Sequence, residues 1–435
     1  MRKILQKILR TLAKIALKKY KPIVIAITGS VGKTSTKEAI FSVLKNHFGE
    51  KRVRRNFRNY NNELGVPLTI FNLETAGKSI LRWIPKFIKI FWMIIFRVSY
   101  PDFLVLEMGA DKPNDIKYLI DFVPHKVGVV TAVGEIPVHV EFFSSPEKVA
   151  EEKETLIKRL SKDGVAILNY DDERVRKMAS ATEAKILTYG LNEKADVKAT
   201  NYDLKILSDN ENTSELNFKL DFKGSSVPAK LINVLGVQHL YSALAAAAVG
   251  IVFNLNLVEI SEAIKEIKPL PGRMHLIKGI KNTLIIDDTY NAAVLSMEAG
   301  LESLKTFDGP PVGPPCCEAG EAGRRKIAVL GEMLEIGQYS PEAHIKIGKK
   351  AAEIADLIFA VGNRANFIAE GAIKSGFPQD KIFQFNTSDE AKLVIQKELK
   401  ENDVVFIKGS RSMKMEKIVK EIMLEPDKAE ELLVH

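Results

Sequence analysis

Short apolar runs that alternate with longer amphipathic segments constrain the fold of this 435-residue chain more than any other feature. Four such runs lie in the first half of the chain, at 22–27, 103–109, 127–133 and 165–170. Their nearly continuous apolar character is typical of strands buried on both faces. Segments 35–47 and 145–160 between them have the spacing of helices. This alternation predicts an α/β protein with parallel sheets that helices cover.

The alternation changes at two places and so divides the chain. Residues 186–232 alternate polar and apolar side chains, which predicts an antiparallel portion of the first sheet. Two prolines and a glycine at 268–274 then precede a second series of strands and helices. We therefore predict a central, mostly parallel domain over 22–270. A doubly wound, Rossmann-like domain should follow over 271–435.

Basic residues are concentrated at the start of the chain. Residues 1–21 contain eight Lys and Arg side chains and no acid, which equals the whole formal net charge of +8. Because the rest of the chain is neutral, we expect no nucleic-acid partner. Apolar residues recur at helical spacing, so the segment should form a basic amphipathic helix. Its apolar face could dock on the protein's own core or lie on an anionic membrane surface.

A second amphipathic stretch, at 80–101, is rich in isoleucine and aromatic residues but carries Arg82, Lys86, Lys89 and Arg97. Its longest uncharged run, 90–96, is far shorter than the roughly 20 residues that span a bilayer. We interpret it as an insertion of about 77–100 that forms an interfacial or partner-binding helix. Burial in a core is the alternative.

The two cysteines, Cys316 and Cys317, are adjacent within a Gly/Pro-rich stretch, 308–325. Adjacent cysteines of this kind make neither a disulfide framework nor a metal site, so we interpret the stretch as a surface loop insertion. The apolar residues at the N-terminus are interrupted by bases, so we expect no signal peptide. A reducing cytoplasm is the expected compartment.

A glycine turn between the first strand and its helix is the strongest functional signal. The turn consists of Thr28, Gly29, Ser30, Val31, Gly32, Lys33, Thr34 and Ser35. Backbone N–H groups of such a turn wrap phosphate oxygens at the positive end of the helix. Lys33 should neutralise the β- and γ-phosphates, and the Thr34 hydroxyl should bind Mg²⁺. The turn therefore predicts that the central domain over 22–270 is of the P-loop ATPase type. The general pattern has a glycine at position 27, where this chain has Ile27, so the match is incomplete.

Polar residues also follow other predicted strands. Glu107 and His139 lie at carboxyl ends of strands, where a carboxylate and an imidazole could hold a divalent cation or could simply be solvated. Lys153 lies among acids on a predicted helix, and such a lysine is usually solvated.

Two groups in the second domain could contact a nucleotide or an anion. Asp287, Asp288, Tyr290 and Asn291 follow a strand and suit hydrogen bonds to a ribose or a base, with Arg273 nearby in sequence. Lys408, Ser410 and Arg411 lie on a strand-to-helix turn and suit an anion, with helix capping as the alternative. Closure of this domain over the first would exclude water from a reactive phosphorylated intermediate.

Ordered blocks of this sequence resemble those of the Mur ligase family, the ATP-dependent amide-forming enzymes of peptidoglycan precursor synthesis, and most of all its MurF type. The blocks are "ITGSVGKTSTKE", "NYNNELGVPLT", "VLEMGADKPNDIKYL", "PGRM", "IIDDTYNA", "AVLGEMLEIG" and "VVFIKGSRSM". They cover residues 22 to 425 in the family's order. The family's phosphate loop is short, which accounts for the glycine missing at position 27.

The resemblance implies that ATP phosphorylates a substrate carboxylate and that an amine attacks the acyl phosphate to form an amide. The implied substrates are small molecules, a UDP-muramyl tripeptide and D-alanyl-D-alanine, and the implied cofactors are ATP and two Mg²⁺ ions. Thr34, Glu107, His139 and a carbamylated Lys153 would serve as metal ligands. Lys33 and Arg273 would contact phosphates, and Asp288 would contact the ribose. His239, Tyr290 and Asn291 would complete the nucleotide site, and Asn61, Asn62, Lys408, Ser410 and Arg411 would bind substrate.

Some positions depart from the family's pattern. Gln238, His239 and Ser242 stand where His, Asn and Asn are usual, which puts the adenine contacts in question. Ala293 and Val294 replace Asn and Pro. The basic helix stands where the family has its UDP-binding domain.

Three functions therefore stay open: a MurF-type ligase, a related ligase that acts on a different carboxylate acceptor, for example a lipid-linked one, and a membrane-associated nucleotide-binding module without ligase chemistry. The joint presence of Lys33, Glu107, His139, Lys153 and Arg273 argues against the third, because nucleotide binding alone does not need that set. We expect a monomer in the cytoplasm and leave peripheral contact with the inner face of the membrane open.

Overall fold

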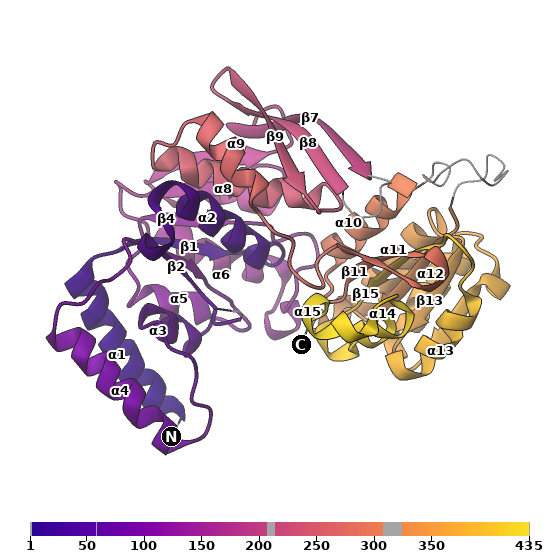
Figure 1. Cartoon of the computed structure of the whole chain (residues 1–435), viewed down its shortest axis with the longest axis horizontal. Coiled ribbons are helices and arrows are strands. Elements are labelled where there is room, and N and C mark those ends of the chain that lie inside the picture. Colours follow the sequence, from indigo (N-terminus) through magenta and orange to yellow (C-terminus); the bar gives the residue numbers. More distant parts are fainter. Residues whose placement is uncertain (1, 58, 207–213, 308–323, 435) are drawn as a thin grey trace.

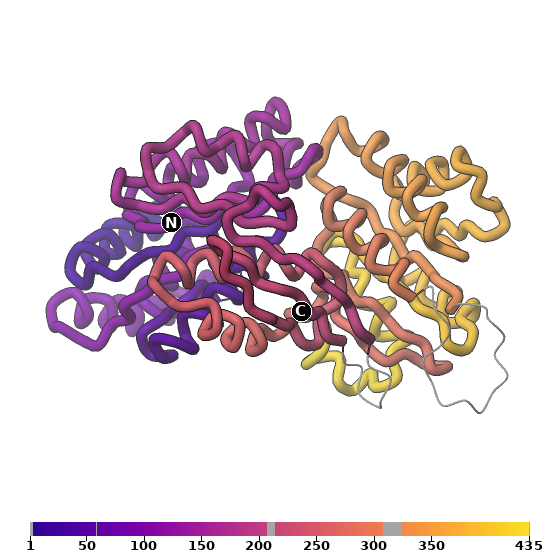
Figure 2. Tube along the Cα trace, turned by 90° about the horizontal axis from the view of Figure 1, so that it is seen from above, coloured from indigo at the N-terminus to yellow at the C-terminus, as the bar shows by residue number. Residues whose placement is uncertain are grey.

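The computed structural model describes residues 2–57, 59–206, 214–307 and 324–434. Two sheets organise these residues into two bodies that lie side by side (Figures 1 and 2). Cys316, Cys317 and nearly all of the predicted loop insertion at 308–325 lie outside the described residues.

The first sheet has nine strands in the order β2-β3-β1-β4-β5-β6-β7-β8-β9. Its strands are β1 (Ile23–Thr28), β2 (Val53–Arg55), β3 (Phe103–Glu107), β4 (Val127–Val130), β5 (Val165–Asn169), β6 (Lys185–Gly190), β7 (Val197–Ile206), β8 (Ser214–Phe222) and β9 (Ser225–Ile232). All pairs from β2 to β7 are parallel, and β7–β8 and β8–β9 are antiparallel. The antiparallel portion therefore begins at β7, and β6 still belongs to the parallel part.

Alternate residues of β1 face opposite sides of this sheet, so helices cover both faces. Ile25 and Ile27 pack in a core beneath α2 (Lys33–Phe48), α8 (Gln238–Val252) and α9 (Leu257–Lys265). Val24 and Ala26 point to the other core. Residues of α1 (Arg2–Tyr20), α3 (Gly65–Ile70), α4 (Ile80–Ile95), α5 (Asp115–Ile120) and α6 (Pro146–Lys158) pack there, and α7 (Glu173–Lys177) lies over β5.

The second sheet has six strands in the order β10-β11-β15-β12-β13-β14, and only the β10–β11 pair is antiparallel. Its strands are β10 (His275–Lys278), β11 (Leu284–Asp288), β12 (Lys326–Gly331), β13 (Leu357–Val361), β14 (Ile382–Phe385) and β15 (Val404–Lys408). One face packs against α10 (Val294–Leu304), α11 (Ser340–Ala352) and α12 (Asn366–Lys374). The other packs against α13 (Ser388–Glu398), α14 (Glu416–Ile422) and α15 (Ala429–Leu432). The predicted α/β class is confirmed.

The N-terminal helix α1 docks on the protein's own core. Leu9, Ala13, Ala16 and Leu17 recur at three- and four-residue spacing and are all buried against the first sheet's second core. Of the two alternatives that the sequence left open for this apolar face, the structure therefore shows the internal one. Within the described ranges no helix combines the length and apolar character that crossing a membrane would require.

Candidate active site between the two domains

The glycine turn connects β1 to α2 in the tight conformation that a phosphate loop needs. Gly32 caps α2 with φ +84°, a left-handed backbone conformation that residues other than glycine rarely adopt. A Cβ atom at Gly29 would lie 1.9 Å from Oγ1 of Thr131, at the end of the neighbouring β4. The Ser30 N–H donates to the Ala132 carbonyl at 2.6 Å. The loop is therefore pressed against the carboxyl end of β4, and substitution of either glycine would displace it.

The Lys33 ammonium group lies over this loop. Its Nζ donates to the carbonyl oxygens of Gly29 at 2.8 Å and Ser30 at 3.2 Å. Burial lowers the pKa of Lys33, the nearby Glu107 carboxylate opposes that shift, and the Arg273 guanidinium adds to it. A cation held only by carbonyl oxygens can exchange them for phosphate oxygens, which carry full negative charge.

The Glu107 carboxylate is buried beside the loop, because β3 pairs with β1 and brings Glu107 opposite Ile27. Asn61 Nδ2 donates to Glu107 Oε1 at 3.0 Å, and Lys37 Nζ lies 3.9 Å from Oε2. Oε2 accepts no hydrogen bond from any part of the chain that the structure describes. A buried carboxylate oxygen without a hydrogen bond is costly unless a cation compensates it, so Glu107 fits a Mg²⁺ ligand.

His139 reaches across to the second domain. Its Nδ1 lies 2.7 Å from Oε2 of Glu335, and its Nε2 lies 3.5 Å from Oδ1 of Asp111. Its φ is +70°, so the chain turns sharply at this residue. The imidazole thus lies between two carboxylates, one from each domain. Among the described residues no three His, Cys, Asp or Glu side chains lie close enough together to hold a metal ion, so His139 could contribute to a metal site only together with other ligands.

Lys153 is buried, although its acidic neighbours in sequence favoured a solvated face. It lies on the inner stripe of α6 with Val149, Leu156 and Ile157, and its exposed fraction is 1%. Burial lowers its pKa to about 7, the Lys33 charge adds to the shift, and Glu152 and Asp111 oppose it. No described residue forms a hydrogen bond or ion pair with its Nζ. Lys153 is therefore a buried amine whose neutral form is accessible near neutral pH.

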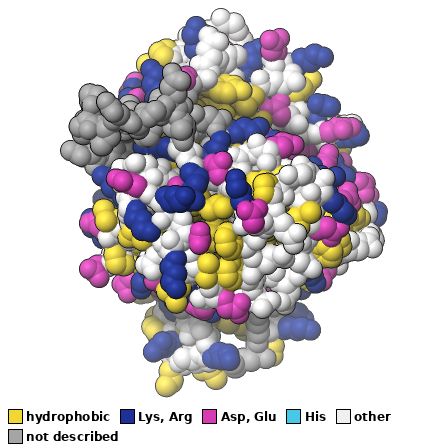
Figure 3. Space-filling view, turned by 90° about the vertical axis from the view of Figure 1, so that its right-hand side faces the viewer, with side chains coloured by type: hydrophobic (Ala, Val, Ile, Leu, Met, Phe, Trp, Pro, Cys, Tyr) yellow, Lys and Arg dark blue, Asp and Glu magenta, His cyan; other side chains and the backbone are white. Residues whose placement is uncertain are grey.

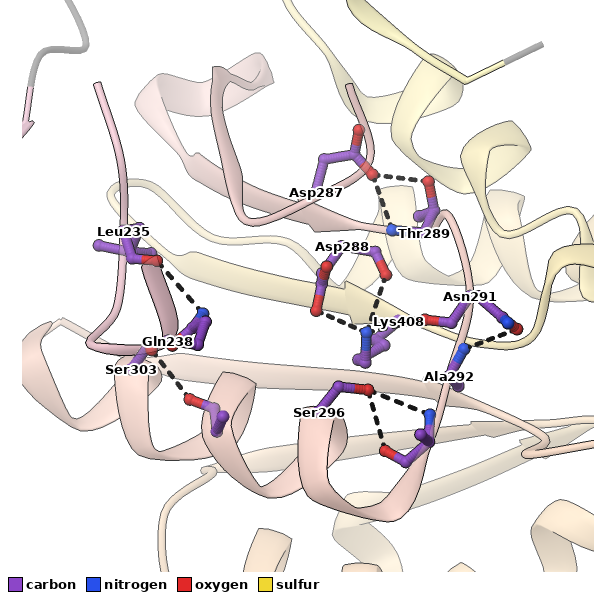
Figure 4. Close-up of polar contacts among 12 residues, drawn as sticks. Leu235, Gln238, Asp287, Asp288, Thr289, Asn291, Ala292, Ser296, Ser303 and Lys408 are labelled. Carbon is purple, nitrogen blue, oxygen red and sulfur yellow. Dashed lines mark hydrogen bonds and ion pairs between the residues drawn. The ribbon is translucent and has the colours of Figure 1, made fainter. Parts of the chain in front are cut away.

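The second domain contributes a cluster at the end of β11, drawn in Figure 4. Lys408 Nζ donates to Asp288 Oδ2 at 2.6 Å and to the Asn291 carbonyl at 2.8 Å. Oδ1 of Asp287 accepts from the N–H and hydroxyl of Thr289, and burial raises the pKa of Asp287 to about 6. Lys408 therefore fixes the loop that carries Asp288, and one Asp288 oxygen is left free of this ion pair.

Arg273 and Tyr290 join this cluster to the first domain. The Arg273 guanidinium stacks over the Tyr290 ring at 4.1 Å, and the Tyr290 hydroxyl donates to Asn59 Oδ1 at 2.6 Å. Burial lowers the pKa of His239 to about 4, and its Nε2 atom forms no hydrogen bond with any described residue. A neutral imidazole therefore stands at one of the positions that depart from the family's adenine contacts.

A cavity of about 1340 Å³ between the domains collects most of the predicted residues. Its lining includes Ser30, Val31, Gly32, Lys33, Thr34, Ser35, Asn61, Glu107, His139, His239, Arg273, Asp288, Tyr290, Asn291 and Lys408. The other predicted residues, Thr28, Gly29, Asn62, Lys153, Ser410 and Arg411, are not part of this lining. Asn62 accepts from the Gly65 N–H at the start of α3, and Ser410 Oγ accepts from the Leu334 N–H. Nη1 of Arg411 lies 3.4 Å from Oε2 of Glu416, so these two side chains form an ion pair.

Sequence reasoning missed several polar partners in this site. Lys37, Asp111 and Glu335 all lie inside the blocks that carry the family resemblance, but only the distances reveal that they surround Glu107 and His139. Asn59 and Tyr241 also line the cavity, and the Tyr241 hydroxyl donates to Asp171 Oδ2 at 3.0 Å.

Two protein-family models match most of the chain. Residues 27–82 and 91–250 match the Mur ligase middle domain, and residues 272–411 match the Mur ligase, glutamate ligase domain. The unmatched residues 83–90 lie within α4.

Two relatives and one solved structure carry the same type of name. The UDP-N-acetylmuramoyl-tripeptide--D-alanyl-D-alanine ligase of Bacillus subtilis (strain 168) is 29% identical over 419 residues, which are 96% of this chain and 79% of the relative. That of Mycobacterium leprae (strain TN) is 31% identical over 399 residues, or 90% of this chain and 71% of the relative. A crystal structure of MurF from Acinetobacter baumannii superposes with a TM-score of 0.75 at 26% identity, over 95% of this chain and 79% of that one. The chain belongs to the Mur ligase family.

Proposed function

We propose that this protein is an ATP-dependent ligase that joins D-alanyl-D-alanine to the terminal carboxylate of a UDP-muramyl tripeptide, in cytoplasmic peptidoglycan precursor synthesis. The observation that carries the proposal is that one cavity is lined by the phosphate loop, by the buried Glu107 carboxylate, and by Arg273 and Asp288 of the second domain. The names of the relatives supply the substrates.

The first chemical step transfers a phosphoryl group. An oxygen of the acceptor carboxylate attacks the γ-phosphorus of ATP, the bond to the β-phosphate oxygen breaks, and ADP leaves. Lys33 exchanges the carbonyl oxygens of Gly29 and Ser30 for phosphate oxygens, and Arg273 reaches the γ-phosphate from the second domain. Asp288 accepts a hydrogen bond from a ribose hydroxyl, while Lys408 holds its other oxygen. Together these contacts fix the phosphate in line with the carboxylate.

Thr34, Glu107 and His139 would hold Mg²⁺, and Oε2 of Glu107, which accepts no hydrogen bond from the described residues, is the feature that fits such an ion. Bound there, Mg²⁺ would neutralise charge on the transferring phosphoryl group.

The second chemical step forms the amide. The neutral amine of the dipeptide attacks the acyl carbon, the amine loses a proton, and inorganic phosphate departs with the oxygen that the carboxylate contributed. The chain's own contribution is to keep water from the acyl phosphate, because residues of both domains line the cavity and closure of the domains would exclude solvent from it.

We further propose that Lys153 carries a carbamate. Its pKa of about 7 leaves much of the amine neutral at physiological pH, and only a neutral amine attacks CO₂. A bond forms between the lysine nitrogen and the carbon of CO₂, and one N–H proton is released. The product is a carbamate anion, so the buried end of the side chain becomes negatively charged. Mass spectrometry of the native protein in bicarbonate, with Lys153→Ala as the control, tests the adduct.

The enzyme is also proposed to act as a monomer with peripheral contact at the inner face of the membrane. One face of α4 is both apolar and exposed, which favours such contact.

Release of ADP tests the ligase proposal. We expect it to require UDP-muramyl tripeptide and D-alanyl-D-alanine together, and to fall to background in Glu107→Gln. No stimulation by this pair, with stimulation by a lipid-linked or shorter acceptor, would refute the substrate assignment and keep the ligase class. No stimulation by any acceptor would refute the class.

A further inference from the structure

α4 presents a second apolar face to solvent in addition to the one that packs on the core. Trp83, Ile90 and Met93 are buried. On the opposite side, eight large apolar side chains within residues 80–96 are between 48% and 78% exposed. These eight residues, here called the outer stripe, are Ile80, Leu81, Ile84, Ile88, Phe91, Trp92, Ile95 and Phe96. Their three- and four-residue spacing makes a continuous strip along the helix, which is unlike the scattered apolar residues normal on a surface.

The outer stripe belongs to a helix that is firmly held. Lys19 Nζ donates to the carbonyl oxygens of Met93 at 3.0 Å, Ile94 at 2.9 Å and Phe96 at 2.6 Å. The Tyr20 hydroxyl donates to the Met93 carbonyl at 2.7 Å. The end of α1 therefore satisfies the free carbonyl groups at the end of α4, and a cation there also suits the helix dipole. The exposed strip is thus a fixed surface of the folded domain.

Charged side chains on α4 and α1 themselves have one sign, and the acids that contact α1, Glu63 and Asp121, come from other elements. Arg82, Lys89 and Arg97 are exposed beside it, and α1 exposes Lys3, Lys7, Lys14 and Lys18. Neither helix contains an Asp or Glu residue. The opposite end of the molecule, seen in Figure 3, has Lys/Arg and Asp/Glu side chains intermixed. An apolar strip with aromatic residues and only positive charge matches an anionic lipid surface, whereas protein interfaces are depleted of lysine.

The position of α1 and α4 leaves the catalytic cavity free. Both helices lie on the side of the first domain that is farthest from the second domain (Figures 1 and 2). The cavity is lined by residues of both domains, and no residue of α1 or α4 is among them. A flat surface bound to the outer stripe would therefore not obstruct closure between the domains.

We propose that the outer stripe and the exposed lysines of α1 form a docking surface for an anionic membrane. The helix lies in the plane of the interface, with Ile and Phe side chains among the acyl chains and the basic groups at the phosphates. This proposal deepens the peripheral contact suggested above and does not depend on the ligase chemistry.

Flotation of the full chain with vesicles tests it. The vesicles are phosphatidylcholine alone, or equal parts of phosphatidylcholine and phosphatidylglycerol. One variant combines Leu81→Gln, Ile88→Gln and Trp92→Gln. The matched control combines Val258→Gln, Leu393→Gln and Leu424→Gln, which are similarly exposed residues elsewhere. A third variant combines Arg82→Gln, Lys89→Gln and Arg97→Gln. Circular dichroism and ADP release in solution report folding and the active site.

We expect the wild type to float with the anionic vesicles and to bind the neutral ones far less. The outer-stripe variant should lower the partition coefficient roughly 100-fold, since three large apolar side chains no longer leave water. The charge variant should lower it by a similar order on anionic vesicles. The matched control should bind like the wild type, and all variants should keep wild-type ADP release.

Three results would overturn the proposal: flotation of the outer-stripe variant equal to that of the wild type, no binding of the wild type to anionic vesicles, or a dimer in sedimentation velocity that the outer-stripe variant dissociates without any vesicle binding. Because ADP release is measured on the same samples, a wild type that does not bind anionic vesicles but shows substrate-stimulated release refutes only the docking surface. Intact docking without substrate-stimulated release refutes only the ligase proposal.

Discussion

Replacement of Lys153 by Met should stabilise the protein at low pH and abolish its proposed activity. Lys153 is 1% exposed, and burial lowers its pKa from 10.5 to about 7. The unfolded chain therefore binds more protons than the folded one between these values, so wild-type stability rises with pH across this window. Below pH 7 both states carry the proton, and the penalty for the buried charge is complete. Methionine has nearly the same shape and no charge, so it removes the penalty.

The expected size follows from the pKa difference. A shift from 10.5 to about 7 corresponds to roughly 5 kcal/mol at 1.36 kcal/mol for each pKa unit, so Lys153→Met should be more stable by about that amount at pH 6. At pH 9 the folded lysine is neutral and the unfolded lysine is still mostly protonated. Only the interval from pH 9 to the unfolded pKa of 10.5 then remains, so the advantage of Lys153→Met should fall to about 2 kcal/mol.

Urea denaturation at pH 6, 7, 8 and 9 measures this difference, in CO₂-free buffer with EDTA so that neither a carbamate nor a metal contributes. Lys158→Met is the control, because Lys158 lies on the same helix with half of its side chain exposed. A stability difference between Lys153→Met and the wild type that stays constant across this range would refute a buried amine with a lowered pKa.

Three further predictions concern the proposed active site. Gly29→Ala should prevent ATP binding measured by calorimetry and cost about 2–3 kcal/mol in urea denaturation, because its Cβ would meet Thr131 in a strained backbone; unchanged ATP affinity would argue against the phosphate loop. Lys408→Met should cost about 3–5 kcal/mol, since it leaves the Asp288 carboxylate without its buried partner, and should raise KM for ATP; a stability loss with unchanged KM would remove Asp288 from the nucleotide site. Lys153→Ala should lose activity and regain part of it with short-chain carboxylates, and full activity without them would contradict the carbamate.

Much of the architecture could be predicted because the strands are marked so clearly. β1, β3, β4 and β5 each consist mainly of buried apolar residues, so their positions could be read from the sequence. The place where the sheet turns antiparallel was harder to predict. Residues 185–190 change from exposed at the start of β6 to buried at its end, so this strand lacks the continuous apolar burial that marks the earlier parallel strands.

The candidate site could be predicted only where one local motif carries it. The turn from Thr28 to Ser35 is such a motif, since its conformation and its ligand follow from consecutive residues. Lys153 shows the limit, because its neighbours in sequence are acids and only the packing of α6 reveals that the amine is buried. The pairs His139–Glu335 and Tyr290–Asn59 join residues about 200 positions apart and depend on how the domains meet.

Transfer of an oxygen isotope tests the central claim, amide formation through an acyl phosphate, most directly. The acceptor tripeptide carries ¹⁸O in its terminal carboxylate, and mass spectrometry measures the label in the inorganic phosphate after one turnover with ATP and D-alanyl-D-alanine. The account predicts that each phosphate released carries one oxygen from the carboxylate, because that oxygen attacks the γ-phosphorus and leaves with it. Unlabelled phosphate, released while the amide forms or without any amide, would contradict the account.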